Sequence, residues 1–354
     1  MTTRGGMTTR GATLAALLVA LGRPAWWLLG LAGFLARGGI LVFFLAVVTL
    51  PSPLALSNVV EPLIRPIVFG GVTPIFLAFL LVGAISLVAW LVAGGWIGAA
   101  TEVVLIRDAR RAAAEEGLRT APDAGAGRWP IARVTAAHFV AHVPLVVAIA
   151  LGSMAIVGVT YIELTNPSEI VTPLPLRIVA GAIGPILAII VTWLVGEVAG
   201  GIAARRIVIA HESVLRAVGG GYADLLFRPR SSLLPALLTA GVLAVDLGAM
   251  LAAVALAWTT TRARLADIPA DPVAIGLALA SFAAAWCLAL VVAGLIDSWR
   301  SVAMTFEVER ALATEESPAD HPEVRDGAAG GGTFGASTHH RPGDWSAGNE
   351  GGSL

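Results

Sequence analysis

The chain has 354 residues, of which 57% are hydrophobic and 13% are charged, and its mean hydropathy is +0.83. A soluble globular domain carries about 25% charged residues, so this composition excludes an ordinary water-soluble fold and predicts surfaces that face lipid. The formal net charge of −1 gives no indication of a nucleic-acid partner, and the single cysteine, Cys287, excludes an intramolecular disulfide or a cysteine zinc cluster.

The first 25 residues predict a cytoplasmic or interfacial N-terminus. Two arginines precede a short apolar stretch at 12–21, and Arg23 follows that stretch directly. This pattern favours an amphipathic helix at the membrane surface over a cleaved signal peptide. The pentapeptide MTTRG occurs at 1–5 and 7–11, so the natural start could be Met1 or Met7.

Six later segments are apolar and long enough to cross a bilayer, because about 20 helical residues cover about 30 Å of hydrocarbon. They are 26–50, 74–98, 136–161, 176–203, 234–259 and 273–296. The first contains Arg37 beside two glycines, so it is either one span or an interfacial helix followed by a short span, and five spans is the alternative count. The segments predict an all-α, polytopic membrane helix bundle over 26–313.

The distribution of arginine predicts the orientation of these spans. All 23 basic residues are arginine; with both chain ends inside, the cytoplasmic segments hold eighteen of them and the outer loops four. Such an excess on one side predicts that both ends lie in the cytoplasm, and we expect the cytoplasmic membrane of a bacterium. The amphipathic stretches 101–118 and 205–217 are expected to lie against the anionic inner leaflet. Residues 314–354, rich in Gly, Ser, Pro and acidic residues, predict a disordered cytoplasmic tail.

A period of about 100 residues runs through the membrane segment. An Arg followed by Pro, directly or after one residue, precedes each odd-numbered span, and Gly94, Gly196 and Gly294 mark the inner ends of the even-numbered spans. The period predicts three hairpin repeats, 1–116, 117–216 and 217–313. The alternative is that all hairpins of arginine-rich membrane proteins look alike. Inverted repeats are disfavoured, because units with an even number of spans keep the same orientation.

Small residues at four-residue spacing predict close helix packing near the inner ends of two spans. The pairs are Gly94 with Gly98 and Gly196 with Gly200. Such pairs let backbones approach in a bilayer, where no hydrophobic force drives helices together. The packing could be within the chain, between copies of it, or with a partner membrane protein.

Five polar residues within the apolar segments predict an intramembrane network. They are Arg37, His138, His142, Glu197 and Asp246. A charge in the hydrocarbon costs about 2.5–3.5 kcal/mol on insertion scales, so each needs a structural or functional reason. Asp246 stands about 12 residues into its span, and we expect Arg37 to pair with Asp246 or Glu197, with the histidines nearby. Such a network either fixes helix register or forms a proton or ion pathway.

Other candidate sites are weaker. His138 and His142 have the spacing of a two-histidine metal site with Glu197 as a third ligand, but residue 139 is Phe, whereas the H-E-x-x-H motif places its catalytic Glu there. We therefore expect no metal and no cofactor. Asp297 lies at the inner edge of the sixth span and is expected to reach the headgroups. The triplet 219–221, three consecutive glycines, predicts a hinge in a cytoplasmic loop.

The three-hairpin layout, with an ending such as Ile296 to Thr305, resembles uncharacterised six-span bacterial membrane proteins. It also resembles the membrane domain associated with glycerophosphodiester phosphodiesterases. The resemblance is one of layout over about 20–313, without a diagnostic motif. The chain has no attached phosphodiesterase domain, so the resemblance implies no activity and no catalytic residue.

These patterns favour a non-enzymatic integral membrane protein with a structural, scaffolding or accessory role. Its expected partners are the lipid bilayer and a membrane protein or a second copy bound between hairpins. The alternative is a small transporter or channel that moves protons or cations past Asp246, Glu197 and His142. A membrane-embedded enzyme comes third, because the sequence shows no reactive cluster.

Overall fold

The computed structural model describes residues 9–45, 47, 73–115, 130–166, 171–266 and 271–315, and about 94% of them are helical, with no strand among them. The helices are α1 (Thr9–Leu21), α2 (Pro24–Phe34), the π-helical turn η1 (Leu35–Gly39), α3 (Ile40–Leu45), α5 (Pro74–Glu115), α6 (Pro130–Ala141), α7 (Val143–Thr165), α8 (Leu174–Gly181), α9 (Ile183–Ile209), α10 (Val214–Phe227), α11 (Pro229–Ala266) and α12 (Pro272–Glu315). The two possible start residues, Met1 and Met7, lie outside the described residues, as do the predicted first outer loop and the tail beyond Glu315.

Six helical stretches are long and apolar enough to cross a membrane. They are Pro24–Phe44, Pro74–Glu115, Pro130–Thr165, Ile183–Ile209, Pro229–Ala266 and Pro272–Leu312. The prediction of six such helices in an all-α chain is confirmed, and by length and composition they indicate a multi-pass membrane protein.

The longest helices extend well beyond their apolar parts. α5 has 42 residues and α12 has 44, which corresponds to about 63–66 Å and is twice the thickness of the hydrocarbon. The prediction that 101–118 lies against a lipid leaflet is wrong for the described residues, because 101–115 continue α5 without a break and bury one face, including Ile106 and Ala109. The same holds for the start of 205–217, where Arg205 to Ile209 form the buried end of α9.

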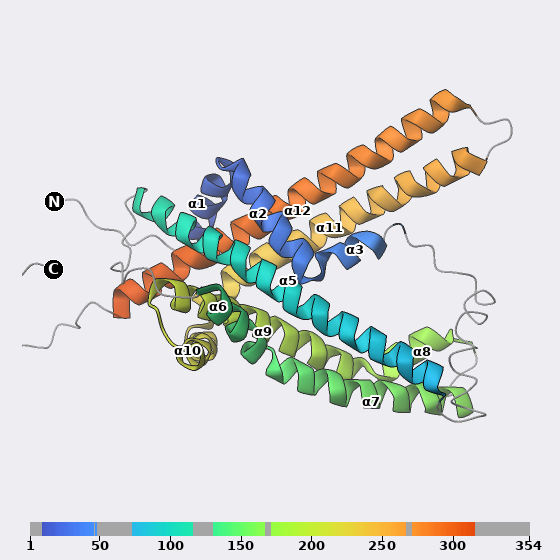
Figure 1. Ribbon diagram of the computed structural model, residues 1–354, viewed down its shortest axis with the longest axis horizontal. Helices are drawn as coiled ribbons and strands as arrows, with labels where there is room; N and C mark the ends of the chain where they lie inside the picture. Colours follow the sequence, from blue (N-terminus) through green and yellow to red (C-terminus); the bar gives the residue numbers. More distant parts are fainter. Residues whose placement is uncertain are drawn as a thin grey trace, which may run out of the picture. The chain divides into compact units, whose positions relative to one another are not determined.

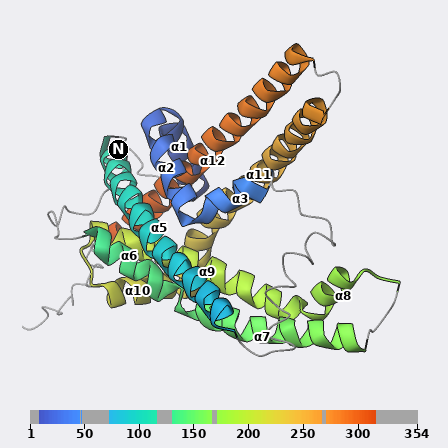
Figure 2. The same ribbon diagram turned by 45° about the vertical axis from the view of Figure 1, so that its right-hand side comes forward.

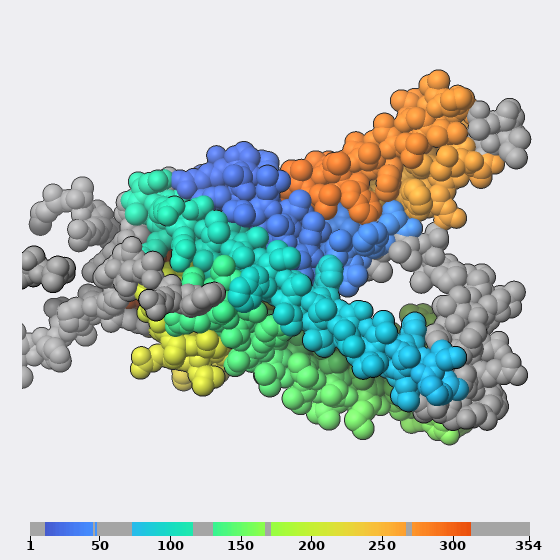
Figure 3. Space-filling view, in the orientation of Figure 1, coloured from blue at the N-terminus to red at the C-terminus, as the bar shows by residue number. Residues whose placement is uncertain are grey.

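The hydrophobic core lies where these extensions meet. Figure 1 shows the long helices converging at the end occupied by α1, α6 and α10, while α11 and α12 diverge from α5, α7 and α9 at the other end, as Figure 2 also shows. Two of the core clusters draw on the parts of α5, α9 and α12 at this end, and a third joins α3, α11 and α12 around Phe43 and Val254. The far parts of α5 and α7 are exposed: Ile75 on α5 is 82% exposed and Met154 on α7 is 74% exposed. The outer half of α5 is visible at the surface in Figure 3.

The first apolar segment bends inside what the sequence predicts as one span. Gly38 has φ of 108°, a conformation that favours glycine, and it separates α2 from α3 through the wide turn η1. The break lies beside Arg37, but Pro24–Phe44 still forms a single helical stretch that is long and apolar enough to cross a membrane, so by length and composition it counts as one kinked span. The third and fourth segments also break, at His142 and at Ala182, each just before a proline that ends the preceding helix.

Candidate functional site: a buried charge cluster where the long helices converge

Glu102 on α5 is the centre of a cluster of buried charged side chains. Its Oε2 forms an ion pair with Nη2 of Arg37, and the same oxygen lies 2.8 Å from Nε2 of His138. Because a carboxylate only accepts hydrogen bonds, the His138 ring nitrogen is the donor. The other oxygen, Oε1, lies 3.0 Å from Nη1 of Arg205. One carboxylate thus joins side chains from η1, α6 and α9.

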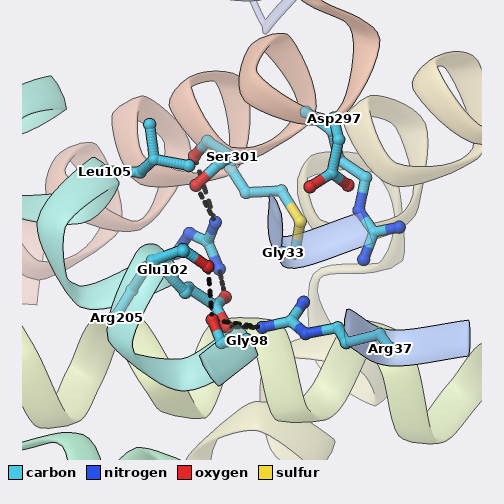
Figure 4. A pocket seen from close by; sticks show the side chains of 11 residues that line it. Gly33, Arg37, Gly98, Glu102, Leu105, Arg205, Asp297 and Ser301 are labelled. Carbon is cyan, nitrogen blue, oxygen red and sulfur yellow. Dashed lines mark hydrogen bonds and ion pairs between the residues drawn. The ribbon is translucent and has the colours of Figure 1, made fainter. Parts of the chain in front are cut away.

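Arg205 connects this carboxylate to α12. Only 2% of Arg205 is exposed, and its Nη2 donates to the carbonyl oxygen and the hydroxyl of Ser301, at 3.1 and 3.2 Å. Its Nη1 also donates to the carbonyl of Gly201, one turn earlier on α9. Figure 4 shows Arg205 between Glu102 and Ser301, with Arg37 approaching Glu102 from the opposite side. A planar guanidinium with several donors suits this bridging position better than the point charge of lysine.

Glu197 forms the second acidic centre, one helix away. Its Oε1 pairs with Nη2 of Arg300 and lies 4.0 Å from Nη1 of Arg37, and its Oε2 lies 3.7 Å from Nε2 of His142. Nδ1 of His142 donates to the carbonyl of His138 at 2.8 Å, so the two imidazoles stand in one connected network. Arg37 therefore touches both acidic centres and links them.

Asp297 completes the cluster from α12. It lines a pocket together with Arg37, Glu102, Arg205 and Arg300, and Figure 4 shows it close to Gly33. Asp297 thus lies beside these arginines at the pocket, whereas the sequence-based expectation placed its side chain among the headgroups. The space within the pocket is about 20 Å³, which is enough to hold a water molecule.

The predicted packing glycines are the positions at which the helices come closest to this cluster. A Cβ on Gly94 would lie 2.2 Å from the carbonyl oxygen of Ala36, and one on Gly98 would lie 2.7 Å from Nε of Arg37. On α9, a Cβ on Gly196 would lie 3.0 Å from the carbonyl oxygen of Ala141, and Gly200 packs against the His138 ring. These glycines let the backbones approach, as in membrane helix packing generally, and here the contacts are within the chain.

The structure brings together four of the five residues proposed from sequence: Arg37, His138, His142 and Glu197. The pairing of Arg37 with Glu197 is present at 4.0 Å, whereas Asp246 makes no hydrogen bond or ion pair within the described part of the chain. Its Oδ2 is buried on the side of α11, in an open groove of about 570 Å³ formed by apolar residues of that helix.

Sequence reasoning missed three members of the cluster: Glu102, Arg205 and Arg300. All three stand in stretches that the sequence assigns to the cytoplasmic side, where charged residues are common, so their burial was not predicted. One sequence pattern does point to these three residues. Glu102 comes eight residues after Gly94, Arg205 nine after Gly196, and Arg300 six after Gly294, so each of these three glycines is followed by a charge about two turns later, with an offset that varies.

A second polar network fixes α10 to the ends of α6 and α9. Arg206 pairs with Asp224 at 2.9 Å and with Glu212 at 3.0 Å, while Arg133 donates to the carbonyl of His211 at 3.0 Å. The predicted hinge at the three glycines is wrong, because they lie inside α10, where Gly221 packs against a carbonyl of α9. The absence of a side chain on Gly221 permits this close contact between helices.

Comparison with protein-family models, curated proteins and solved structures finds no match to this chain. The cluster must therefore be interpreted from its own chemistry. Among the described residues, no three His, Cys, Asp or Glu side chains are placed to hold a metal ion, because each histidine faces a different carboxylate. The arrangement is a set of buried ion pairs that joins five helical segments.

Proposed function

We propose that this chain is a non-catalytic, multi-pass protein of the bacterial cytoplasmic membrane with both ends inside, and that it acts as a scaffold or accessory protein. In this proposal the buried cluster clamps the helices at their inner ends. The outer apolar halves remain free to contact lipid, a partner membrane protein or a second copy.

The observation that carries the proposal is the charge balance of the cluster. Three arginines face three carboxylates: Arg37, Arg205 and Arg300 against Glu102, Glu197 and Asp297. Buried ion pairs contribute little net stability, but removing one partner leaves an uncompensated charge, so such a set fixes one arrangement of the helices. A site built to bind a charged substrate would instead leave charge uncompensated.

The space inside the cluster and the surface outside it support the same conclusion. The pocket between the charged groups has about 20 Å³ of space, enough for a water molecule, and so small a space suits a clamp. None of the most apolar 18-residue stretch of α5 is buried within the chain. Only 6% of the corresponding stretch of α6 and α7 is buried. Exposed apolar surface of this extent requires lipid or protein to cover it.

The test combines flux with cross-linking. In proteoliposomes we expect no proton or monovalent cation flux, measured with pH-sensitive and ion-sensitive dyes. In a Cys287→Ser background, a photo-cross-linker attached at Met154→Cys on the exposed face of α7 should join the chain to one defined protein or to itself in native membranes. Flux that disappears in Glu197→Gln would overturn the proposal. The same holds if neither Met154 nor an equivalent site at Ile75 yields any protein cross-link.

A second candidate, a small transporter or channel, is favoured by one observation. Asp246 presents a carboxyl oxygen without a hydrogen-bond partner inside an apolar groove, which is costly unless a ligand or ion uses it. In this reading Asp246→Asn abolishes flux in proteoliposomes while the protein stays folded. In the scaffold reading the same variant changes no transport property and retains or gains stability.

A further inference from the structure

α10 exposes a second apolar face in addition to the one it packs against the chain. Ala217, Val218 and Gly221 are buried against α6 and α9. On another side of the helix, Leu215 is 74% exposed and Leu226 is 73% exposed, and the two stand eleven residues apart, which is close to three full turns. Phe227, next to Leu226, is 78% exposed. A helix in water would not present three large apolar side chains in this way.

The position of α10 matches the inner boundary of the apolar segments. A Cβ on Gly221 would lie 2.5 Å from the carbonyl oxygen of Ala199, close to the end of the apolar segment 176–203. The hydroxyl of Tyr222 donates to the carbonyl of Ala141 at 2.7 Å, next to the start of α7. Figure 1 shows α10 almost end-on, so it crosses the long helices instead of running beside them.

The charges beside this face are positive. Arg216 follows Leu215 on the exposed side, and Arg230 stands exposed just beyond the end of α10. Neither forms an ion pair with another described side chain. The acidic residue of α10, Asp224, is already paired with Arg206 at 2.9 Å. The exposed face of α10 therefore combines large apolar groups with uncompensated arginines.

We propose that α10 is an interfacial anchor that inserts Leu215, Leu226 and Phe227 among the lipids of the inner leaflet, with Arg216 and Arg230 binding anionic phospholipid headgroups. An amphipathic helix with apolar side chains on one face and arginines at its edge has the chemistry that binds such a surface. This inference rests on the proposed membrane orientation. It replaces the sequence-based expectation that the whole of 205–217 lies on the leaflet, because Arg205 to Ile209 are in the core.

The single native cysteine makes a depth measurement possible. In a Cys287→Ser background, a spin label is placed at Phe227→Cys or Leu215→Cys, and the protein is reconstituted in vesicles of phosphatidylcholine with roughly one third phosphatidylglycerol. Collision with oxygen, which enters lipid, and with a water-soluble nickel chelate reports the depth of the label. We expect both labels at the interface, shielded from the chelate and open to oxygen.

Two control labels separate the failure of this inference from failure of the proposed membrane orientation. A label at Leu151→Cys, on the exposed side of α7, should lie deep in the lipid, and one at Glu115→Cys, at the end of α5, should lie in water. If the Leu151 label is deep and the Phe227 label is as open to the chelate as the Glu115 label, the anchor is refuted and the proposed membrane orientation is retained. If the Leu151 label also lies in water, the proposed membrane orientation itself is refuted.

Lipid selectivity tests the role of the arginines. The preference for spin-labelled phosphatidylglycerol over spin-labelled phosphatidylcholine should fall when Arg216 and Arg230 are both changed to Gln, by up to roughly fivefold for each arginine. The charge-conserving change of both residues to Lys should keep the preference. An unchanged preference in the Gln variant refutes anionic headgroup binding, as does an equal loss in the Lys variant. Gel filtration of each variant shows that it is folded.

Discussion

Removing the carboxylate of Glu102 should destabilise the protein more than any other single change in the cluster. Glu102→Gln keeps the shape of the side chain but turns three arginines against three carboxylates into three against two. Breaking a buried ion pair in this way costs about 3–5 kcal/mol, because the remaining charge stays buried. The matched control is Glu115→Gln on the same helix, whose ion pair with Arg23 is 66% exposed on the glutamate side. Exposed pairs contribute about 0–1 kcal/mol.

The difference between these two variants is measured as the free energy of unfolding in mixed micelles. A denaturing detergent is titrated into the protein in a mild one, and tryptophan fluorescence and circular dichroism follow the loss of structure. We expect Glu102→Gln to lose at least about 2 kcal/mol more than Glu115→Gln. Adding Arg37→Gln to Glu102→Gln restores the charge balance and should recover part of the loss. Equal losses in the two single variants would refute the clamp.

Three further changes test packing and titration. Gly294→Ala should lose about 1–3 kcal/mol, since its Cβ would lie 2.3 Å from a carbonyl oxygen of α2, whereas Gly276→Ala on the same helix meets no atom and should cost nothing. Gly38→Ala should lose about 1–3 kcal/mol because its φ of 108° strains any other residue, and a loss below that of Gly276→Ala would contradict this. Burial raises the pKa of the Tyr222 hydroxyl. The contribution of this neutral hydroxyl to the free energy of unfolding is therefore complete below about pH 10, the ordinary pKa of tyrosine, and is lost as pH rises through the raised pKa. Tyr222→Phe should therefore flatten the fall in stability above pH 10, and an unchanged profile would refute this.

The six apolar helices of membrane length could be predicted from the sequence because hydropathy acts locally. A run such as 273–296 is apolar enough to indicate a membrane helix without knowledge of its neighbours. The packing of the helix extensions beyond these apolar runs was harder to predict, because amphipathic stretches pack equally well against lipid or protein. Residues 101–115 and 205–209 pack against protein, and only the tertiary arrangement decides between these partners.

The candidate site was predictable only in part, for the same reason. Arg37, His138, His142 and Glu197 could be found because a polar residue within an apolar run is costly wherever it points. Glu102 stands just beyond such a run, in a stretch where charges are common, so its burial depends on the helices that meet there. Asp246 was predicted to join the cluster but does not, because a position near mid-span makes a charge costly without placing its side chain beside the other charges.

The continuity of α12 has a mechanical consequence. Fifteen residues separate Arg300 from the end of the helix, so a rotation of roughly 10° about the cluster would move that end by about 4 Å. The ion pair of Arg110 with Glu309, at 2.8 Å, ties the inner parts of α5 and α12 together, so the two helices would swing as one lever. In a bilayer, a change of thickness alters helix tilt and would thus displace this joined end.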